Sequence, residues 1–426
     1  MVESKSQAKS FGIDKRVVWE AWRQVRADRG AAGVDEEAVA RFERDLKGNL
    51  YKLWNRMASG AYMPPPVRIV RVPKGDRRVV IRARGVSTVA DRVAQTVVKL
   101  YMEPAVERLF HEDSYGYRPG RSALDAVKIC RERCWRSDWA IRLDYAAFFD
   151  SVDHELVLKA VAAHTDRRWI SLYIERWLKA PRDQESDTSV ARDRGTPLGS
   201  AIAPVLANIY LHYAFDAWIA REFPDVPFER YAGDLVVHCK SERQARLVLG
   251  RIGLRMADCH LECSDGKTPI VYCKDSNRQG SHERERFEFL GYAFRPRRAR
   301  NRWGELFTSF LPAIGDGAAR TIRRTIRRWR LHLWSGTSLA GIARKINRTV
   351  QGWIDYYGRF YPAELARKAL RGIDVYLVRW AMRKYKRLRG HRKRAWKFLA
   401  DVFAREPELF AHWKVVRADD RTVGAV

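Results

Sequence analysis

Acidic residues are scarce in this sequence: 51 Asp and Glu stand against 81 Lys and Arg, so the 426-residue chain carries a net charge of +30. Long apolar runs are also missing. No segment approaches the length of a membrane-spanning helix, and the first residues lack the apolar stretch of a secretory signal. We therefore expect a soluble, cytoplasmic protein without a membrane partner. The excess of positive charge favours nucleic acid as the partner.

Cysteine is scarce as well, with only six residues, at positions 130, 134, 239, 259, 263 and 273. Two pairs, 130 with 134 and 259 with 263, have a spacing that places both thiols on one helical face. Neither pair forms a Cys-x-x-Cys knuckle or precedes a histidine pair, which argues against zinc. We expect buried or half-buried free thiols, as in a reducing compartment.

The residues that are abundant indicate a large folded protein. Hydrophobic residues make up 46% of the chain and 15 residues are tryptophan, so the positive charge does not belong to a disordered tail. The length predicts two to three domains. No internal repeat or low-complexity linker is visible between them.

The N-terminal part predicts helices followed by a hairpin. Residues 12–60 are helical in pattern, and residues 88–110 predict a long helix. Between these helices, residues 67–72 and 79–81 alternate like two strands around a basic turn at 74–76. Two apolar stripes are expected to face inward in residues 12–60: Val18, Trp19, Trp22 and Val25, then Phe42, Leu46, Leu50 and Leu53.

Two carboxylates at strand ends are the candidate centre of the chemistry. Asp144 follows the apolar strand 140–143, and residues 228–239 predict a hairpin that turns at Gly233 and Asp234. Strands with acids at their ends and helices between them predict an α+β palm. Nucleotidyl transfer needs carboxylates from separate strands, because two Mg²⁺ ions must hold the attacking and leaving oxygens.

After about residue 300 the sequence changes to arginine-rich helices. One helical face carries basic residues of a single sign, and Ile322, Ile326, Trp329 and Leu333 occupy the opposite face. A second basic run covers residues 384–394. Such faces favour tracking of RNA phosphates over ordinary solvation. The candidate RNA-binding residues are Arg320, Arg323, Arg324, Arg327, Arg328, Lys384, Lys386, Arg387, Arg392 and Lys393.

Six segments in order carry a resemblance to a known family: 49–57, 88–95, 111–122, 148–154, 287–292 and 352–358. Together with the two palm segments, they make the chain similar to bacterial group II intron-encoded reverse transcriptase/maturases of the short form, without an endonuclease domain. The resemblance covers nearly the whole chain and implies a right-hand polymerase. It implies a helical N-terminal extension (1–60), fingers and palm (61–300), a helical thumb/maturase domain (301–395) and a C-terminal tail (396–426).

The same resemblance implies roles for single residues. Asp144, the backbone carbonyl of Tyr145 and Asp234 would bind Mg²⁺, two ions per active site, with Mn²⁺ as an alternative. Phe149 would be the steric gate against a ribose 2′-hydroxyl. Lys74 and Arg82 would meet the incoming triphosphate, and Lys267 would protonate the leaving pyrophosphate. The implied partners are structured intron RNA, an RNA template with a DNA primer, and dNTPs.

The sequence departs from the family pattern near this centre. Gly233 replaces the first aspartate of the Tyr-Ala-Asp-Asp hairpin, and Leu198, at the nucleotide-binding position, replaces a glutamine. Ala203 stands where the family has serine, and residues 84–87 also differ. Three functions remain open: an active RNA-directed DNA polymerase and maturase of a mobile element, a polymerase-deficient splicing maturase, and a domesticated defence-type relative.

Overall fold

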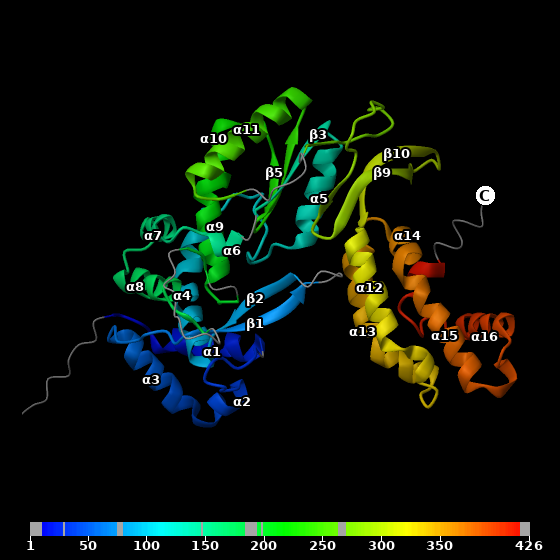
Figure 1. Cartoon of the computed structure of the whole chain (residues 1–426), viewed down its shortest axis with the longest axis horizontal. Helices are drawn as coiled ribbons and strands as arrows, with labels where there is room; N and C mark the ends of the chain where they lie inside the picture. The colour runs from blue at the N-terminus through cyan, green and yellow to red at the C-terminus, as the bar shows by residue number, and fades with distance from the viewer. Residues whose placement is uncertain are drawn as a thin grey trace, which may run out of the picture. The chain divides into compact units, whose positions relative to one another are not determined.

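The computed structural model describes residues 11–28, 30–74, 80–145, 148–183, 194–196, 199–262 and 270–417 (Figure 1). The chain forms two compact units. The first comprises residues 1–122, 143–235 and 246–268, and the second comprises residues 123–142, 236–245 and 269–426. The mixture of helices and small sheets confirms the predicted α+β class.

Helices α1 to α4 and the first hairpin build the N-terminal part. The elements are α1 (Lys15–Asp28), α2 (Val39–Phe42), η1 (Glu43–Asp45), α3 (Leu46–Ala58), β1 (Val67–Lys74), β2 (Val80–Val86) and α4 (Val89–Val106). Strands β1 and β2 pair antiparallel, with Val72 opposite Arg82, as the alternation predicted (Figure 1). Val18, Trp22 and Val25 are buried as expected, but Trp19 is 50% exposed. Trp19 was wrongly assigned to the core because it lies at the edge of the apolar stripe.

The middle of the chain alternates helices and short strands. The elements are α5 (Ala123–Cys134), β3 (Trp139–Asp144), α6 (Phe148–Ser151), α7 (His154–Ala162), α8 (Arg168–Leu178), β4 (Arg182–Asp183), α9 (Ala203–Leu211), the π-helical turn η2 (His212–Asp216), α10 (Ala217–Glu222), β5 (Phe228–Tyr231), β6 (Asp234–Cys239), α11 (Glu242–Asp258) and β7 (Ile270–Tyr272). Four of these strands form a sheet in the order β5-β6-β3-β7, which confirms the predicted strands around Asp144 and Asp234.

A buried hydrogen-bond network fixes α4 to the segment 199–201. Asp91 accepts from the Tyr62 hydroxyl (2.8 Å) and the Trp177 indole (2.7 Å). Gln95 donates to Asp91 (2.8 Å) and accepts from the Ser200 hydroxyl (2.9 Å). Burial raises the pKa of Asp91 despite these donors. Each of these polar groups has a hydrogen-bond partner, so the network holds helix α4 in one position.

The last part of the chain holds a three-stranded sheet and a helical bundle. Its elements are β8 (Phe287–Phe289), β9 (Tyr292–Arg300), β10 (Leu306–Ile314), α12 (Asp316–Trp329), η3 (Leu331–Leu333), α13 (Leu339–Tyr357), α14 (Pro362–Leu365), the π-helical turn η4 (Ala366–Leu370), α15 (Arg371–Lys384), η5 (Lys386–Leu388) and α16 (Arg392–Arg405). Strands β9 and β10 form a long antiparallel hairpin (Figure 1). Helices therefore begin at Asp316, later than the expected position near residue 300.

The helical bundle buries the faces that the pattern predicted, with one exception. Ile322 and Ile326 of α12 are buried, and Trp329 stacks on Trp353 of α13 at 5.4 Å between ring centroids. Leu333 was expected on the same face but is 44% exposed. The reason is that α12 ends at Trp329 and is followed by Arg330, whose left-handed backbone (φ 47°) breaks the helical period before Leu333 is reached.

The described cysteines fit the expectation of buried thiols. Cys130, Cys134, Cys239, Cys259 and Cys273 are all buried and reduced, and Cys263 lies outside the described residues. Burial raises the pKa of the Cys134 thiol to about 12, so it stays protonated. Within the described part of the chain, no helix combines the length and the apolar character needed to cross a membrane.

Candidate active site

The two predicted carboxylates lie at the same end of neighbouring strands. Asp144 is the last residue of β3 and Asp234 the first of β6, and these strands are adjacent in the sheet. The Tyr145 N–H donates to the Gly233 carbonyl at 3.3 Å, which joins the two strand ends directly. Asp144 is exposed, and Asp234 is half-buried. The first compact unit thus holds Asp144, Tyr145 and Asp234 at these strand ends, and Phe149 follows on α6.

The hairpin tip is strained at Ala232, the residue before the glycine. Ala232 has a left-handed backbone with φ 54°, an uncommon conformation for a residue with a Cβ atom. Gly233 lies outside the left-handed region, so its backbone does not require glycine. A Cβ atom at this position would lie 3.3 Å from Cβ of Phe148. The space beside Gly233 is therefore tight but not closed.

Aromatic rings line the region next to the carboxylates. Phe149 of α6 is half-buried, and its ring lies 6.5 Å from Tyr117 and 5.3 Å from Phe148 between centroids. Tyr117 is 53% exposed and also approaches Tyr231, at 6.0 Å. Such a half-open aromatic surface can contact a sugar or base face. Phe149 is therefore partly open on a surface that it shares with Tyr117.

The backbone of α6 is held by the segment 194–196. The Thr196 N–H donates to the Phe149 carbonyl at 2.6 Å, and the Gly195 N–H donates to the Val152 carbonyl at 2.7 Å. Gly195 has φ 84°, and a Cβ atom there would lie 2.7 Å from the Asp150 carbonyl oxygen. Only glycine allows this close approach. These contacts fix the position of Phe149.

A fully buried ion pair links the β5–β6 hairpin to η2. The Arg230 guanidinium donates to both carboxylate oxygens of Asp216, at 2.7 and 2.6 Å, and neither side chain has exposed surface. Arg230 also donates to Asn208 (2.9 Å), whose amide donates to the Gly116 carbonyl (2.8 Å). The hairpin therefore rests on a satisfied polar network of four segments.

Of the other nearby acids, one is unsuited to binding a metal. Asp150 is exposed on α6. Asp153 caps helix α7 by accepting from the Leu156 N–H at 3.0 Å, and it contacts the His260 ring at 2.8 Å. Although partial burial opposes the change, these hydrogen bonds lower the pKa of Asp153. Asp153 is occupied as a helix cap and does not replace the missing carboxylate at position 233.

The donor set at the strand ends fits a hard divalent cation. Two carboxylates, Asp144 and Asp234, and the Tyr145 carbonyl would supply only oxygen ligands, the type that Mg²⁺ and Mn²⁺ prefer. The exposure of Asp144 leaves room for water and for a substrate phosphate at this residue. Gly233 contributes no side-chain ligand, so this set is smaller by one carboxylate than the family pattern.

Four predicted nucleotide-site residues can be described only in part or not at all. Lys74 is the last residue of β1, and Arg82 lies on β2. Their backbones place both on the hairpin that was expected to meet the triphosphate. Leu198 and Lys267 lie outside the described residues.

Most of the predicted RNA-binding residues are exposed on the second unit. Arg320, Arg327 and Arg328 are exposed on α12, and Arg324 is half-buried. Arg323 donates to the Lys368 carbonyl at 2.7 Å. Lys386, Arg387, Arg392 and Lys393 are exposed. Lys384 differs: its ammonium donates to the Ser335 and Thr337 carbonyls at 2.9 and 3.3 Å, so it fixes a loop.

Sequence reasoning missed the supporting residues Arg230, Asp216, Asn208 and Tyr117. A charged pair, Glu229 and Arg230, between two aromatic residues in a short strand was a signal for Arg230, because burial of a cation requires a partner. Nothing in the sequence indicated which acid that partner is.

Comparison with known proteins identifies the family. The model of the reverse transcriptase (RNA-dependent DNA polymerase) family matches residues 72–294. The model described as group II intron, maturase-specific domain matches residues 319–397. The first match covers more than half of the chain and contains both Asp144 and Asp234. The second begins within the basic helix α12 and contains its residues 319–329. Divalent metal ions are the usual cofactors of reverse transcriptases.

Individual relatives agree with the two matches. The chain is 31% identical to protein YkfC of Escherichia coli over 329 residues, which are 67% of this chain and 82% of YkfC. It is 27% identical to the group II intron-encoded protein LtrA of Lactococcus lactis over 198 residues, or 46% of this chain and 32% of LtrA. Nuclear intron maturase 1 of Arabidopsis thaliana is 29% identical over 89 residues, or 21% of this chain and 12% of that protein. The chain thus spans most of YkfC but about a third or less of the other two.

The palm carboxylates, the basic helical unit and these matches lead to one conclusion: the chain belongs to the reverse transcriptase family, as a reverse transcriptase/maturase of the group II intron-encoded type.

Proposed function

We propose that the protein is a group II intron-type RNA-directed DNA polymerase and maturase, which binds structured intron RNA and copies an RNA template from a DNA primer with dNTPs. The observation that carries the polymerase role is the meeting of Asp144 and Asp234 at adjacent strand ends, joined through Tyr145 and Gly233. The exposed arginines of α12 support the RNA-binding role.

The residues of the site have separate tasks in this proposal. Asp144, Asp234 and the Tyr145 carbonyl would hold Mg²⁺, or Mn²⁺ in its place. The bound cation would neutralise phosphate charge during nucleotidyl transfer. The Phe149 backbone, whose carbonyl accepts from the Thr196 N–H, positions a ring that would restrict the space for a 2′-hydroxyl. The buried Arg230–Asp216 pair keeps the hairpin in register, so Asp234 is held in a fixed position relative to Asp144.

The remaining assignments rest on the family resemblance. Lys74 and Arg82 on the β1–β2 hairpin would bind the triphosphate, and Leu198 would line the nucleotide site. Lys267 would donate a proton to the leaving pyrophosphate. A Lys267→Ala variant should lower the rate of nucleotide addition without weakening RNA binding, and parallel measurements of both quantities would check this.

A second function is favoured by Gly233: a maturase that binds intron RNA but has little polymerase activity. The glycine removes one carboxylate from a site where metal-bound charge stabilises the transition state. The folded hairpin and the exposed basic face would remain sufficient for RNA binding.

Primer extension on poly(rA)/oligo(dT), with Mg²⁺ or Mn²⁺, distinguishes the two functions. Extension that is abolished in Asp144→Asn supports the polymerase. Intact RNA binding without extension supports the polymerase-deficient maturase.

RNA binding is tested separately by its salt dependence. Replacing Arg320, Arg327 and Arg328 with glutamine should flatten the plot of log affinity against log salt by about 0.7 to 0.9 for each phosphate that the variant no longer neutralises. An unchanged slope would remove α12 from the RNA-binding surface.

A further inference from the structure

An arginine-lined pocket lies in the second unit, and no residue of α12 lines it. Its volume is about 330 Å³, and it is bounded by strand β9 on one side and by the start of α14 and η4 on the other. The residues that line it include Arg295, Arg297, Arg298, Tyr361, Glu364 and Arg367. This volume is at the lower end of the range for ligand sites and far exceeds the space of a water molecule.

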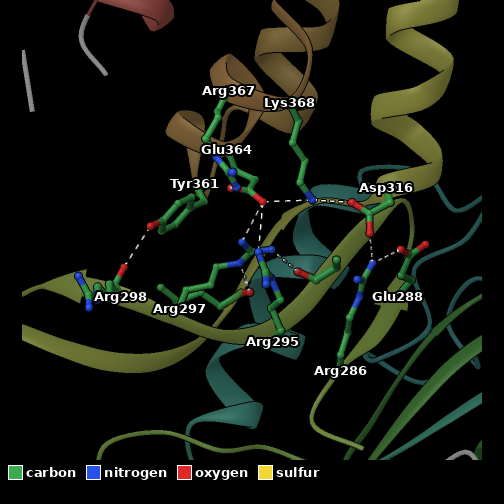
Figure 2. A network of polar contacts seen from close by, with 12 residues as sticks. Arg286, Glu288, Arg295, Arg297, Arg298, Asp316, Tyr361, Glu364, Arg367 and Lys368 are labelled. Carbon is green, nitrogen blue, oxygen red and sulfur yellow. Dashed lines mark hydrogen bonds and ion pairs between the residues drawn. The ribbon is translucent and has the colours of Figure 1, made fainter. Parts of the chain in front are cut away.

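A single buried carboxylate organises the cations around this pocket (Figure 2). The Glu364 side chain is only 5% exposed and pairs with Arg295 at 3.3 Å and Arg297 at 3.4 Å from the strand side. From the helix side it pairs with Arg367 and with Lys368, the latter at 3.1 Å. Lys368 also pairs with Asp316 at 2.6 Å, so its charge is shared with a second carboxylate.

The pocket lining has more positive than negative charge. Four arginines stand against the one carboxylate of Glu364 in the lining. Arg297 is the most enclosed, with 4% of its side chain exposed, and burial together with the charge of Arg295 lowers its pKa. Its guanidinium donates to the Leu311 carbonyl (3.2 Å) and lies 5.4 Å from the Tyr361 ring centroid. The arginines are therefore fixed in place, and Glu364 neutralises only part of their positive charge.

An ion network that served only the stability of the fold would not need exposed arginines at the mouth of the pocket. One carboxylate satisfies Arg297 at the base, yet Arg298 is exposed and the Arg367 side chain is 60% exposed at the pocket mouth. The Tyr361 hydroxyl donates to the Arg298 carbonyl at 3.1 Å, which fixes the backbone at the mouth. Guanidinium groups in a fixed fork are the usual partners of phosphate oxygens.

The pocket is linked to α12 through Lys368. Arg323 of α12 donates to the Lys368 carbonyl at 2.7 Å, and Lys368 directly follows Arg367 of the pocket. Asp316, the first residue of α12, pairs with Lys368. A nucleic acid backbone on α12 would therefore have a preformed phosphate site within reach. An isolated pocket for a free nucleotide would not need this link.

We propose that this pocket binds one phosphodiester group of an RNA backbone and so fixes the position of RNA along α12. The proposal rests on the RNA-binding function proposed above and adds to it a defined anchoring point. Arg295, Arg298 and Arg367 contact the phosphate oxygens, while Glu364 and Tyr361 hold Arg297 and the strand in position.

The test compares two triple variants that remove the same charge. The first replaces Arg295, Arg298 and Arg367 with glutamine. The control replaces Arg136, Arg302 and Arg405, three exposed arginines of the same unit that lie outside the pocket lining. Affinity for a fluorescently labelled structured fragment of group II intron RNA is measured between about 50 and 200 mM salt. Melting temperature is measured for each variant.

We expect the pocket variant to lose about tenfold in affinity and to flatten the salt slope by about 0.7 to 0.9, the value for one phosphate. The control should keep the parent slope. If the triple variant does not fold, Arg298→Gln alone is used, and the same direction of change is expected.

Three results would overturn the proposal. Equal slopes in the pocket variant and the control, with a parent that binds RNA, would reject the pocket alone. A parent without salt-dependent RNA binding would reject the proposed function as well. Calorimetric titration with inorganic phosphate and dNTP separates the sources of the anion: binding that the pocket variant loses while its RNA slope stays unchanged would assign the pocket to a free phosphate compound.

Discussion

Replacing Gly233 with aspartate should raise Mg²⁺-dependent DNA synthesis, because the change adds a carboxylate beside Asp144 and Asp234. The backbone permits it: Gly233 lies outside the left-handed region, and the left-handed residue of the turn is Ala232. The new Cβ atom would lie 3.3 Å from Cβ of Phe148, which is 5% exposed. The Phe148 side chain must shift by a few tenths of an ångström to accept it.

The stability cost of this shift is small compared with the expected gain in rate. Mild overpacking costs about 1 kcal/mol, and loss of glycine freedom in the unfolded chain returns about 0.4 to 1 kcal/mol. A site that gains several kcal/mol of electrostatic stabilisation in the transition state gains about tenfold in rate for each 1.4 kcal/mol. We therefore expect primer extension to rise by at least about 10²-fold.

Matched variants separate charge from shape. Gly233→Asn has nearly the same size without the charge, and Gly233→Ala adds only the Cβ atom, so neither should raise extension on poly(rA)/oligo(dT). Adding Leu198→Gln to Gly233→Asp should raise the rate further, and RNA affinity should stay the same in every variant. Equal rates for the aspartate and asparagine variants, or a parent that already polymerises well, would refute the view that this hairpin lacks a functional ligand. Phe148→Leu provides the needed room if Gly233→Asp lowers the melting temperature.

Two further predictions use other parts of the structure. Phe149→Val should lower the preference for dNTPs over NTPs by about 10- to 100-fold, since it removes the ring that restricts the sugar space; equal selectivity in single-nucleotide incorporation would reject the gate. Glu364→Gln should flatten the loss of stability at acid pH. Although burial opposes the change, the surrounding cations depress the folded pKa of Glu364 from 4.5 to about 2. The contribution of Glu364 to stability is therefore complete above the unfolded pKa and disappears as the pH falls from about 5 towards 2. Urea unfolding at pH 7 and pH 3 checks this, with an equal pH dependence in both proteins as the contrary result.

The palm was predictable from the sequence because its signals are local. One apolar run precedes Asp144 and another follows Asp234, and both predict strands. The structure places these two strands in one sheet. The amphipathic helix α12 was equally predictable from the sequence, with Ile322 and Ile326 buried opposite the arginines. Patterns of period 2 and 3.6 need no tertiary information.

The failures came from features that depend on tertiary structure. Trp19 and Leu333 lie where a stripe ends or a helix stops, so period alone assigned them wrongly to the interior. Strand β10 lies in a region that was expected to be helical, because its apolar residues come in adjacent pairs, Leu306–Phe307 and Phe310–Leu311, which hide the alternation of a strand. Lys384 is engaged by carbonyls of a loop almost 50 residues away, which no local pattern predicts.

The buried Arg230–Asp216 pair allows stability and site geometry to be tested apart. Asp216→Asn leaves the Arg230 charge without a compensating carboxylate where neither side chain is exposed, and should cost about 3 to 5 kcal/mol in urea unfolding. Arg230→Met combined with Asp216→Leu should recover most of that stability, because apolar residues of similar volume often replace a buried pair at no net cost. The double variant still lacks the donor to Asn208, so the hairpin loses this side-chain link towards Gly116 and keeps only the backbone hydrogen bonds of residue 230 to Asp113 and Tyr115. Primer extension, measured in the Gly233→Asp background if the parent is silent, should therefore stay low although the fold is restored. Extension at the parental rate in the double variant would show that the pair serves stability alone, and an Asp216→Asn variant as stable as the parent would contradict the buried pair itself.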